Sequence, residues 1–293
     1  MGENNSILGE IQRFFVVTML LVLVSTPHIC MADQEKPPAG DCITKLETGT
    51  VNWTTGTITA LGKALPGDQS QSAKESVFLS ARSDAVRNII NTLKQIKINN
   101  ELSVSEYAST SNVILAGLEK TAREAIVSKQ IYTSAHAVEI TIEASLFGGF
   151  LQLILPEEIR QIPKINPEIN PKKVPGIGKS LNSGLIIDAR GLGIEPVLVP
   201  VIVSEQGHEA YSSVFISREF AVQIGVCKYV CSLDQALQDK RIGDNPLVLK
   251  GLRKEGRQNA TLVISMSDYL VLEKATERHI FLNECKVIIV RDQ

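Results

Sequence analysis

Gly178-Lys179-Ser180 has the residue types that end a phosphate-binding loop. Such a loop needs a glycine five positions earlier, a strand before it and a helix after it. Position 173 is Lys173, prolines precede the segment, and the following residues 184–190 are strand-like. Gly191-Leu192-Gly193 is no dinucleotide fingerprint either, because Pro196 occupies the place of the third glycine. The sequence therefore predicts neither a nucleotide site nor a cofactor.

Four charged or titratable residues in the second half form the best candidate for a ligand site. Asp188 and Arg190 lie two positions apart in a strand-like run, so they project from the same face. Glu205 and His208 lie in a turn between two neighbouring strand-like runs. These four side chains could converge on a groove, or they could be surface charges that pair with each other. The prediction favours surface charges, with no catalytic residue, and keeps the groove as the alternative.

Four cysteines follow residue 32: Cys42, Cys227, Cys231 and Cys285. The spacing of Cys227 and Cys231 does not fit a redox Cys-x-x-Cys pair, and zinc sites usually supply two cysteine hooks. The three histidines after residue 32 belong to no recognised nucleophile or metal motif. We therefore expect disulfides rather than a metal in an oxidising compartment. Four cysteines allow three pairings, and the sequence does not choose among them.

The N-terminal residues predict export. Residues 14–24 are an uncharged apolar run of the length of a signal-peptide core, too short to cross a bilayer comfortably. Cys30-Met31-Ala32 then offers small residues at the positions that signal peptidase requires, which predicts cleavage after Ala32. Arg13 is the only basic residue before the apolar run. A start at Met1 that lies too early, or an uncleaved anchor, would explain this scarcity.

Cys30 also raises the question of lipid attachment. A bacterial lipobox has a small residue just before the cysteine and usually leucine three positions before it. Here these positions hold Ile29 and Pro27. The match is poor, so a soluble protein is favoured while membrane association stays open.

Length and composition fit two globular domains. The chain has 293 residues and a formal net charge of −2, which argues against a nucleic-acid partner. Prolines punctuate the middle of the chain and mark a linker. The predicted divisions are a signal peptide (1–32), a flexible leader (33–45), a first domain (46–155), a proline-rich linker (156–180) and a second domain (181–293).

Both domains are predicted to be α+β, each an antiparallel or mixed sheet packed with one or two helices. In the first, a threonine-rich strand over residues 48–62 precedes a long helix to Ile96, whose apolar residues recur every three or four positions. A shorter helix over 111–122 and two strands, 124–133 and 137–146, follow. The second strand alternates apolar and polar residues, which is typical of a half-buried strand.

The second domain is predicted to contain short apolar strands and two helices. The strand-like runs include residues 184–190, 195–203, 247–254 and 261–266, and a last strand begins at Cys285. Helices are predicted over 232–240 and 268–277. The two prolines in the run 195–203 limit how central that strand can be.

The first half resembles a bacterial family named for a twenty-kilodalton outer-membrane lipoprotein, and the N-terminal domain of flagellar assembly protein T. The resemblance covers residues 46–149: a glycine-containing strand, a helix with Ala81-Arg82 and Ala85, then paired strands with Val138, Ile140 and Gly148. The second half, from "SGLIIDARGLG" to "LVISMSDYLVLEKA", resembles uncharacterised envelope proteins of Gram-negative bacteria.

These resemblances imply an envelope location and a non-enzymatic role in binding or assembly. The expected function is an exported module of the periplasm or outer membrane that binds other envelope proteins, with a flagellar or secretion role as an extension. The alternative is a periplasmic hydrolase or small-ligand-binding protein with a site near Asp188, Arg190 and His208.

Overall fold

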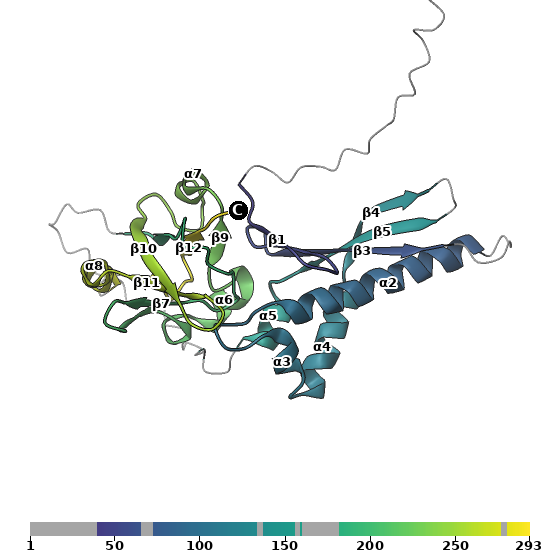
Figure 1. Cartoon of the computed structure of the whole chain (residues 1–293), viewed down its shortest axis with the longest axis horizontal. Helices are drawn as coiled ribbons and strands as arrows, with labels where there is room; N and C mark the ends of the chain where they lie inside the picture. The colour runs from purple at the N-terminus through teal and green to yellow at the C-terminus, as the bar shows by residue number, and fades with distance from the viewer. Residues whose placement is uncertain (1–39, 66–72, 134–136, 156–158, 160–181, 277–279) are drawn as a thin grey trace, which may run out of the picture. The chain divides into compact units, whose positions relative to one another are not determined.

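Helix α2 (Ala73–Gln95) and a five-stranded sheet organise the first half of the chain (Figure 1). All neighbouring strands of this sheet are antiparallel. Their order is β1 (Ile43–Lys45), β2 (Thr50–Asn52), β3 (Thr57–Ala64), β5 (Val138–Ser145) and β4 (Ile126–Tyr132). Since β3 and β5 pair over eight residues, they form the centre of the sheet.

The computed structural model describes residues 40–65, 73–133, 137–155, 159, 182–276 and 280–293. The predicted signal peptide with Cys30 and the cleavage site after Ala32 therefore lies outside the described residues. The same holds for most of the proline-rich linker.

Helix α2 packs on one face of β3 and β5, as its apolar stripe predicts. Ala81, Ala85, Ile89 and Leu93 on the helix are fully buried. The alternation of β5 is confirmed, because Val138, Ile140, Ile142 and Ala144 are buried on the helix side while the residues between them are more exposed. Gly62 permits the close approach: a Cβ there would lie 2.1 Å from the carbonyl oxygen of Ala81.

The single strand predicted over residues 48–62 is wrong, because the segment is a hairpin. The side-chain oxygen of Asn52 accepts hydrogen bonds from the backbone N–H groups of Thr54 and Thr55, which turns the chain. Gly56 completes the turn with a φ of +71°. The predicted flexible leader is also too long, since the structure includes residues 40–45 in the fold and places β1 in the sheet.

Three further helices complete the described part of the first half. They are α3 (Val104–Ala108), α4 (Asn112–Arg123) and α5 (Gly149–Ile154). Helix α4 matches the predicted helix, and the hydroxyl of Ser111 caps it by accepting a hydrogen bond from Val113 N–H. Helices α3 and α5 are too short for periodicity to predict them.

The second half is built on a seven-stranded mixed sheet. Its order is β8 (Glu209–Tyr211), β7 (Val201–Ser204), β11 (Thr261–Ile264), β10 (Leu247–Glu255), β6 (Leu185–Asp188), β12 (Val287–Val290) and β9 (Lys228–Val230). Strands β6 and β12 are parallel neighbours, and all four residues of β12 are buried. Such burial on both faces explains why these strands read as continuous apolar runs.

Short helices surround this sheet: α6 (Arg218–Ile224), α7 (Leu233–Leu237), α8 (Met266–Thr276) and the 3-10 turn η2 (Ser213–Phe215). The predicted strand over residues 195–203 is only partly correct, because β7 begins at Val201. Before it, Leu198 N–H and Val199 N–H donate to the carbonyl oxygens of Lys97 and Ile98 in the first half of the chain. These hydrogen bonds take the place of strand pairing within the sheet, which Pro196 and Pro200 make unfavourable for this segment.

One sheet in each half confirms the predicted α+β class with two sheets. Residues Gly40–Gln293 nevertheless form one compact unit. Its main apolar core includes buried residues from both halves, among them Trp53 and Tyr229, whose rings meet edge to face at 5.7 Å. The disulfide between Cys42 and Cys231 joins the two halves covalently.

Candidate functional site

Asp188 and Arg190 form an ion pair with each other at the end of β6. Arg190 Nε and Nη2 donate to the two carboxylate oxygens of Asp188 at 2.8 and 2.7 Å. These hydrogen bonds hold the pKa of Asp188 below its ordinary value. Next to them, Gly191 N–H donates to the carboxylate of Asp292 at 2.9 Å. This arrangement fixes the turn that follows β6 and leaves the Asp188 carboxylate already neutralised.

Glu205 and His208 lie after β7 and also have local partners. Glu205 accepts a hydrogen bond from the N–H of Met266, the first residue of α8, at 3.2 Å. The His208 ring lies against the ring of Tyr269 on the same helix, with the ring centres 5.5 Å apart. Both side chains therefore help to seat α8 on the sheet.

The structure does not bring these two pairs together. Strands β11 and β10 separate β7 from β6, so the strand ends lie three interstrand spacings apart, about 14 Å. Each charged group is already paired within its own pair or with α8. The arrangement supports the interpretation of the four residues as structural surface groups and gives no support to a hydrolase site.

The four cysteines that the structure describes divide into one disulfide and two thiols. Cys42 and Cys231, whose Cα atoms are 5.3 Å apart, are bonded. Cys227 and Cys285 are free. Burial raises the pKa of Cys227 to about 12 and that of Cys285 to about 11, although the nearby Arg241 acts in the opposite direction. Thiols held neutral in this way are poor nucleophiles, so neither cysteine suits covalent catalysis.

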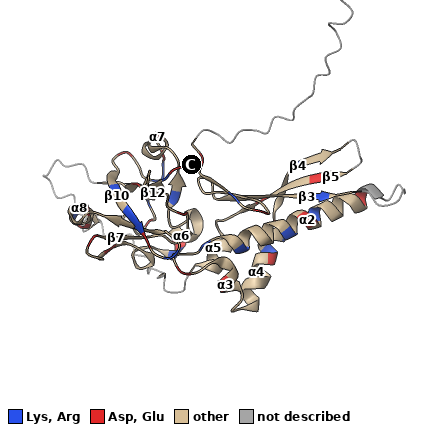
Figure 2. Ribbon diagram, in the orientation of Figure 1, with Lys and Arg blue, Asp and Glu red and all other residues tan. Residues whose placement is uncertain are grey.

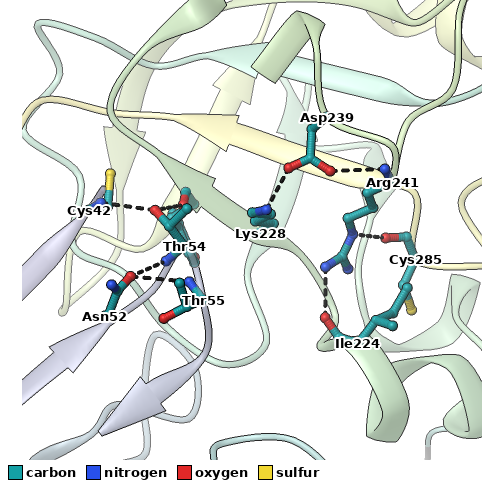
Figure 3. A network of polar contacts seen from close by, with 10 residues as sticks. Cys42, Asn52, Thr54, Thr55, Ile224, Lys228, Asp239, Arg241 and Cys285 are labelled. Carbon is teal, nitrogen blue, oxygen red and sulfur yellow. Dashed lines mark hydrogen bonds and ion pairs between the residues drawn. The ribbon is translucent and has the colours of Figure 1, made fainter. Parts of the chain in front are cut away.

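Arg241, beside these thiols, is a structural residue. Its guanidinium donates to the carbonyl oxygens of Cys285 and Ile224, both at 2.7 Å (Figure 3). It also donates to the carbonyl oxygen of Gly225 at 2.5 Å. The last two carbonyls end helix α6, where a cation is favourable. All three groups that Arg241 binds are backbone atoms of the protein, so its charge is used in holding loops together.

Lys228 and Asp239 form a second partly buried pair in the same network. Lys228 Nζ lies 2.5 Å from Asp239 Oδ2, and Arg241 N–H donates to Asp239 Oδ1 (Figure 3). Burial acts to raise the pKa of Asp239, but these hydrogen bonds outweigh it and lower the pKa. In the part of the chain that the structure describes, no three histidine, cysteine or acidic side chains cluster so that they could hold a metal ion.

The β1 side of the first sheet is tied to the second half of the chain. Cys42, just before β1, is bonded to Cys231, and Cys231 N–H donates to the carbonyl oxygen of Gly40. Thr54 adds a hydrogen bond from its hydroxyl to the carbonyl oxygen of Tyr229 (Figure 3). These contacts hold the start of β1 and the turn after β2 against the second half of the chain.

The free half of β3 is closed in another way. Strand β2 pairs only with Thr57–Thr59, so among the described residues no strand lies on that side of Ala60–Ala64. Helix α2 supplies side chains instead: Asp84 accepts from Lys63 N–H at 3.0 Å and Asn88 donates to the carbonyl oxygen of Leu61 at 2.7 Å. These two side chains satisfy backbone groups that an added strand would otherwise bind.

Strand β4, at the opposite edge, is open. All seven of its residues are exposed, because α2 covers β3 and β5 but not β4. Within the described residues its backbone pairs with β5 alone. Ile126 and Tyr132 at its two ends are 67% and 62% exposed, and Val127 and Ile131 are also exposed. An exposed strand with apolar residues on both faces can accept another strand.

The register of β4 on β5 shows which residues of β4 lie on each face of the sheet. Val127, Gln130 and Tyr132 lie opposite buried residues of β5, on the side of α2. Ile126, Lys129 and Ile131 lie on the other face, opposite Glu143, Thr141 and Glu139. The sequence signal for this edge was the pattern "IVSKQIY", where apolar pairs at both ends replace strict alternation. The sequence predicts the strand but not its exposure.

The helices of the first half carry charges of both signs. Figure 2 shows basic and acidic residues interspersed along α2 and α4. Several of them pair on the helix surface, such as Arg123 with Glu119 at 2.9 Å. No helix among the described residues is both long and apolar enough to cross a membrane.

Comparison with known proteins covers the second half only. A family model described as the second domain of Treponema pallidum Tp0624 matches residues 184–293. This range begins just before β6 and includes the whole seven-stranded sheet. No curated protein matches the chain. The second half is therefore similar to that domain, and the match assigns it no chemistry.

Proposed function

We propose that the protein is an exported, non-enzymatic binding module of the bacterial envelope, and that it binds its partner through the open edge of β4. The partner is an extended segment of another envelope protein that adds a strand to the first sheet. The observation that carries this proposal is the exposure of all seven residues of β4, with apolar side chains at both ends.

Strand addition fits this edge for two reasons. The unpaired backbone groups of an edge strand supply hydrogen bonds to an incoming segment, and neighbouring side chains supply specificity. Ile126, Val127, Ile131 and Tyr132 would lose exposed apolar surface on both faces of the sheet, at about 25 cal/mol per Å². The free half of β3 also lacks a strand on one side, but Asp84 and Asn88 already satisfy backbone groups there.

The non-enzymatic part of the proposal draws on the state of the candidate chemical groups. Asp188 is paired with Arg190, and the thiols of Cys227 and Cys285 have raised pKa values. A binding role also agrees with the resemblance of the first half to the lipoprotein family. A flagellar or secretion role is an extension of that resemblance and is tested by motility and secretion of a deletion strain.

A matched pair of substitutions tests the binding edge. Tyr132→Asp places a charge on β4, and Val113→Asp places the same charge at a 73%-exposed position of α4. In native electrophoresis of gently solubilised envelopes, we expect the unsubstituted chain and Val113→Asp to migrate in a complex larger than the 32.0 kDa chain. Tyr132→Asp should release the free chain. An intact complex with Tyr132→Asp, or no complex with the unsubstituted chain, contradicts the proposal.

The export part is tested by fractionation of the host and mass spectrometry of the N-terminus. A chain that begins at Asp33 in the soluble periplasm is the expected result. An acylated Cys30 in the membrane fraction would contradict the prediction of a soluble protein and would place the binding edge at a membrane surface.

A further inference from the structure

A groove of about 310 Å³ opens where β4 begins. Ile126, the first residue of β4, is part of its wall, together with Glu124, Glu143, Phe147 and Phe150. A strand that adds to β4 along its full length must therefore pass the mouth of this groove. The groove and the open edge form one continuous surface.

The walls of the groove differ in chemistry. Phe150 is buried and Phe147 is partly buried, and they give the groove an apolar side. Glu143 and Glu124 bring carboxylates to its rim. Lys and Arg side chains have an apolar stem and a charged head, so such a groove suits one of them better than an acidic or a purely apolar side chain.

The carboxylate of Glu143 is available to a partner. Within the described residues it makes no hydrogen bond or ion pair, whereas Glu139, four residues earlier on the same face of β5, binds Lys63 at 2.6 Å. Glu124 has only a long contact of 3.8 Å with Lys120, and both side chains are largely exposed. The two carboxylates of β5 thus differ in one respect: Glu139 is neutralised and Glu143 is not.

We propose that the strand-adding partner carries a lysine or arginine beside Ile126, and that this side chain enters the groove and pairs with Glu143. This inference rests on the proposed function, because it names the partner chemistry of the same edge. Lys129, which has no ion pair in the described part of the chain, lies at the centre of β4 and favours an acidic or neutral polar residue opposite it. The partner segment is therefore basic at one end, and apolar where it passes Ile131 and Tyr132.

A second copy of the chain does not fit this description. Antiparallel pairing of two β4 strands over their full length would place the two Lys129 side chains opposite each other. Like charges directly opposite in a ladder are destabilising. Each groove would then face Tyr132 of the other copy rather than a basic residue.

The test uses a phage-displayed library of random linear twelve-residue peptides, selected on the full chain. Enriched peptides are synthesised and their Kd is measured by fluorescence polarisation for the unsubstituted chain and for Glu143→Gln, Glu139→Gln and Tyr132→Asp. We expect a lysine or arginine near one end of the enriched peptides. Glu143→Gln should weaken binding at least tenfold, and the control Glu139→Gln less than threefold. Salt should weaken the binding of the unsubstituted chain more than that of Glu143→Gln.

The outcomes separate this inference from the proposed function. Peptides whose binding is lost with Tyr132→Asp but unchanged with Glu143→Gln would overturn the basic anchor and keep the binding edge. Enriched peptides without a basic residue would overturn it too, as would a library that yields no binder. Peptides that bind Tyr132→Asp as well as the unsubstituted chain would count against β4 itself.

Discussion

The two sides of the first sheet differ in how many contacts they make with the rest of the chain. On the β1 side, a disulfide from Cys42 joins the start of the sheet to the second half, and the side chains of Asp84 and Asn88 close the free half of β3. On the β4 side, all seven residues are exposed. Natural sheets protect their edges against unwanted pairing. Under the proposed function, the closed β1 side serves folding and the open β4 edge binds the partner.

The open edge still has protection against the wrong partner. Lys129 lies at its centre, and the pairing with β5 shifts register between Val127 and Lys129. A lysine and a bulge are both devices that discourage edge-to-edge aggregation. They leave the apolar ends of the strand accessible, so β4 can select a partner rather than exclude all of them.

The largest expected effect is at the centre of the closed side. Gly62→Ala would place a Cβ 2.1 Å from Ala81 O and 2.3 Å from Ala85 N, both backbone atoms of α2. We expect a loss of about 3 kcal/mol or more in the free energy of unfolding, or failure to fold. Urea unfolding measures it. The control Ser128→Ala, on β4, should change stability by less than about 0.5 kcal/mol. Equal losses of stability for Gly62→Ala and Ser128→Ala would contradict the contrast between β3 and β4.

Removal of the disulfide should have the next largest effect. The double variant Cys42→Ser, Cys231→Ser lacks the bond that joins the start of the sheet to the second half. This bond links residues 189 positions apart in the sequence. We expect a loss of about 2–5 kcal/mol in urea unfolding. Reductant should destabilise the unsubstituted chain by a similar amount and leave the double variant unchanged. If reductant has no effect on the unsubstituted chain, the closed side does not depend on this bond.

Smaller losses are expected at the helix side chains that close β3. Asp84→Ala and Asn88→Ala each leave one backbone group of β3 without its partner, at a cost of about 1 kcal/mol. The control is Ser80→Ala at an exposed position of α2, which should have almost no effect. If the double variant Asp84→Ala, Asn88→Ala is as stable as the control, the two side chains do not close this edge.

The smallest change in stability, with a change in association, is expected at the centre of the open edge. Lys129→Val removes the charge that discourages self-pairing, so the free energy of unfolding should stay within about 0.5 kcal/mol while the chain self-associates. Sedimentation velocity detects the association. Lys45→Val, the matched substitution on β1, should leave association as in the unsubstituted chain. Association of Lys45→Val to the same extent would mean that β1 is as open as β4.

Local patterns in the sequence predicted the elements whose surroundings are regular. The stripe from Ala73 to Ile96 gave α2, and the alternation from Val138 gave β5, because each buries one face against the other. The hairpin at Asn52 was missed, since β-branched residues continue through the turn and hide it. The segment before Val201 was missed because its partner, Lys97 and Ile98, is distant in sequence.

The candidate site depended even more on tertiary structure. Asp188 and His208 have the residue types of a ligand site, but whether β6 and β7 are neighbours is decided by strand order, which the spacing of residues does not determine. Likewise, β4 is exposed because α2 covers β3 and β5 but not β4. The pairing of Cys42 with Cys231 was one of several open choices.

Site-specific photo-cross-linking in the native host tests the binding edge most directly. A photoreactive amino acid replaces Lys129 on β4 in one strain and Lys45 on β1 in another, so that two exposed lysine positions of the same sheet are compared. The account predicts a discrete adduct with an envelope protein from position 129 and none from position 45. Adducts from position 45 alone, or from both positions equally, would contradict the assignment of β4 as the binding edge.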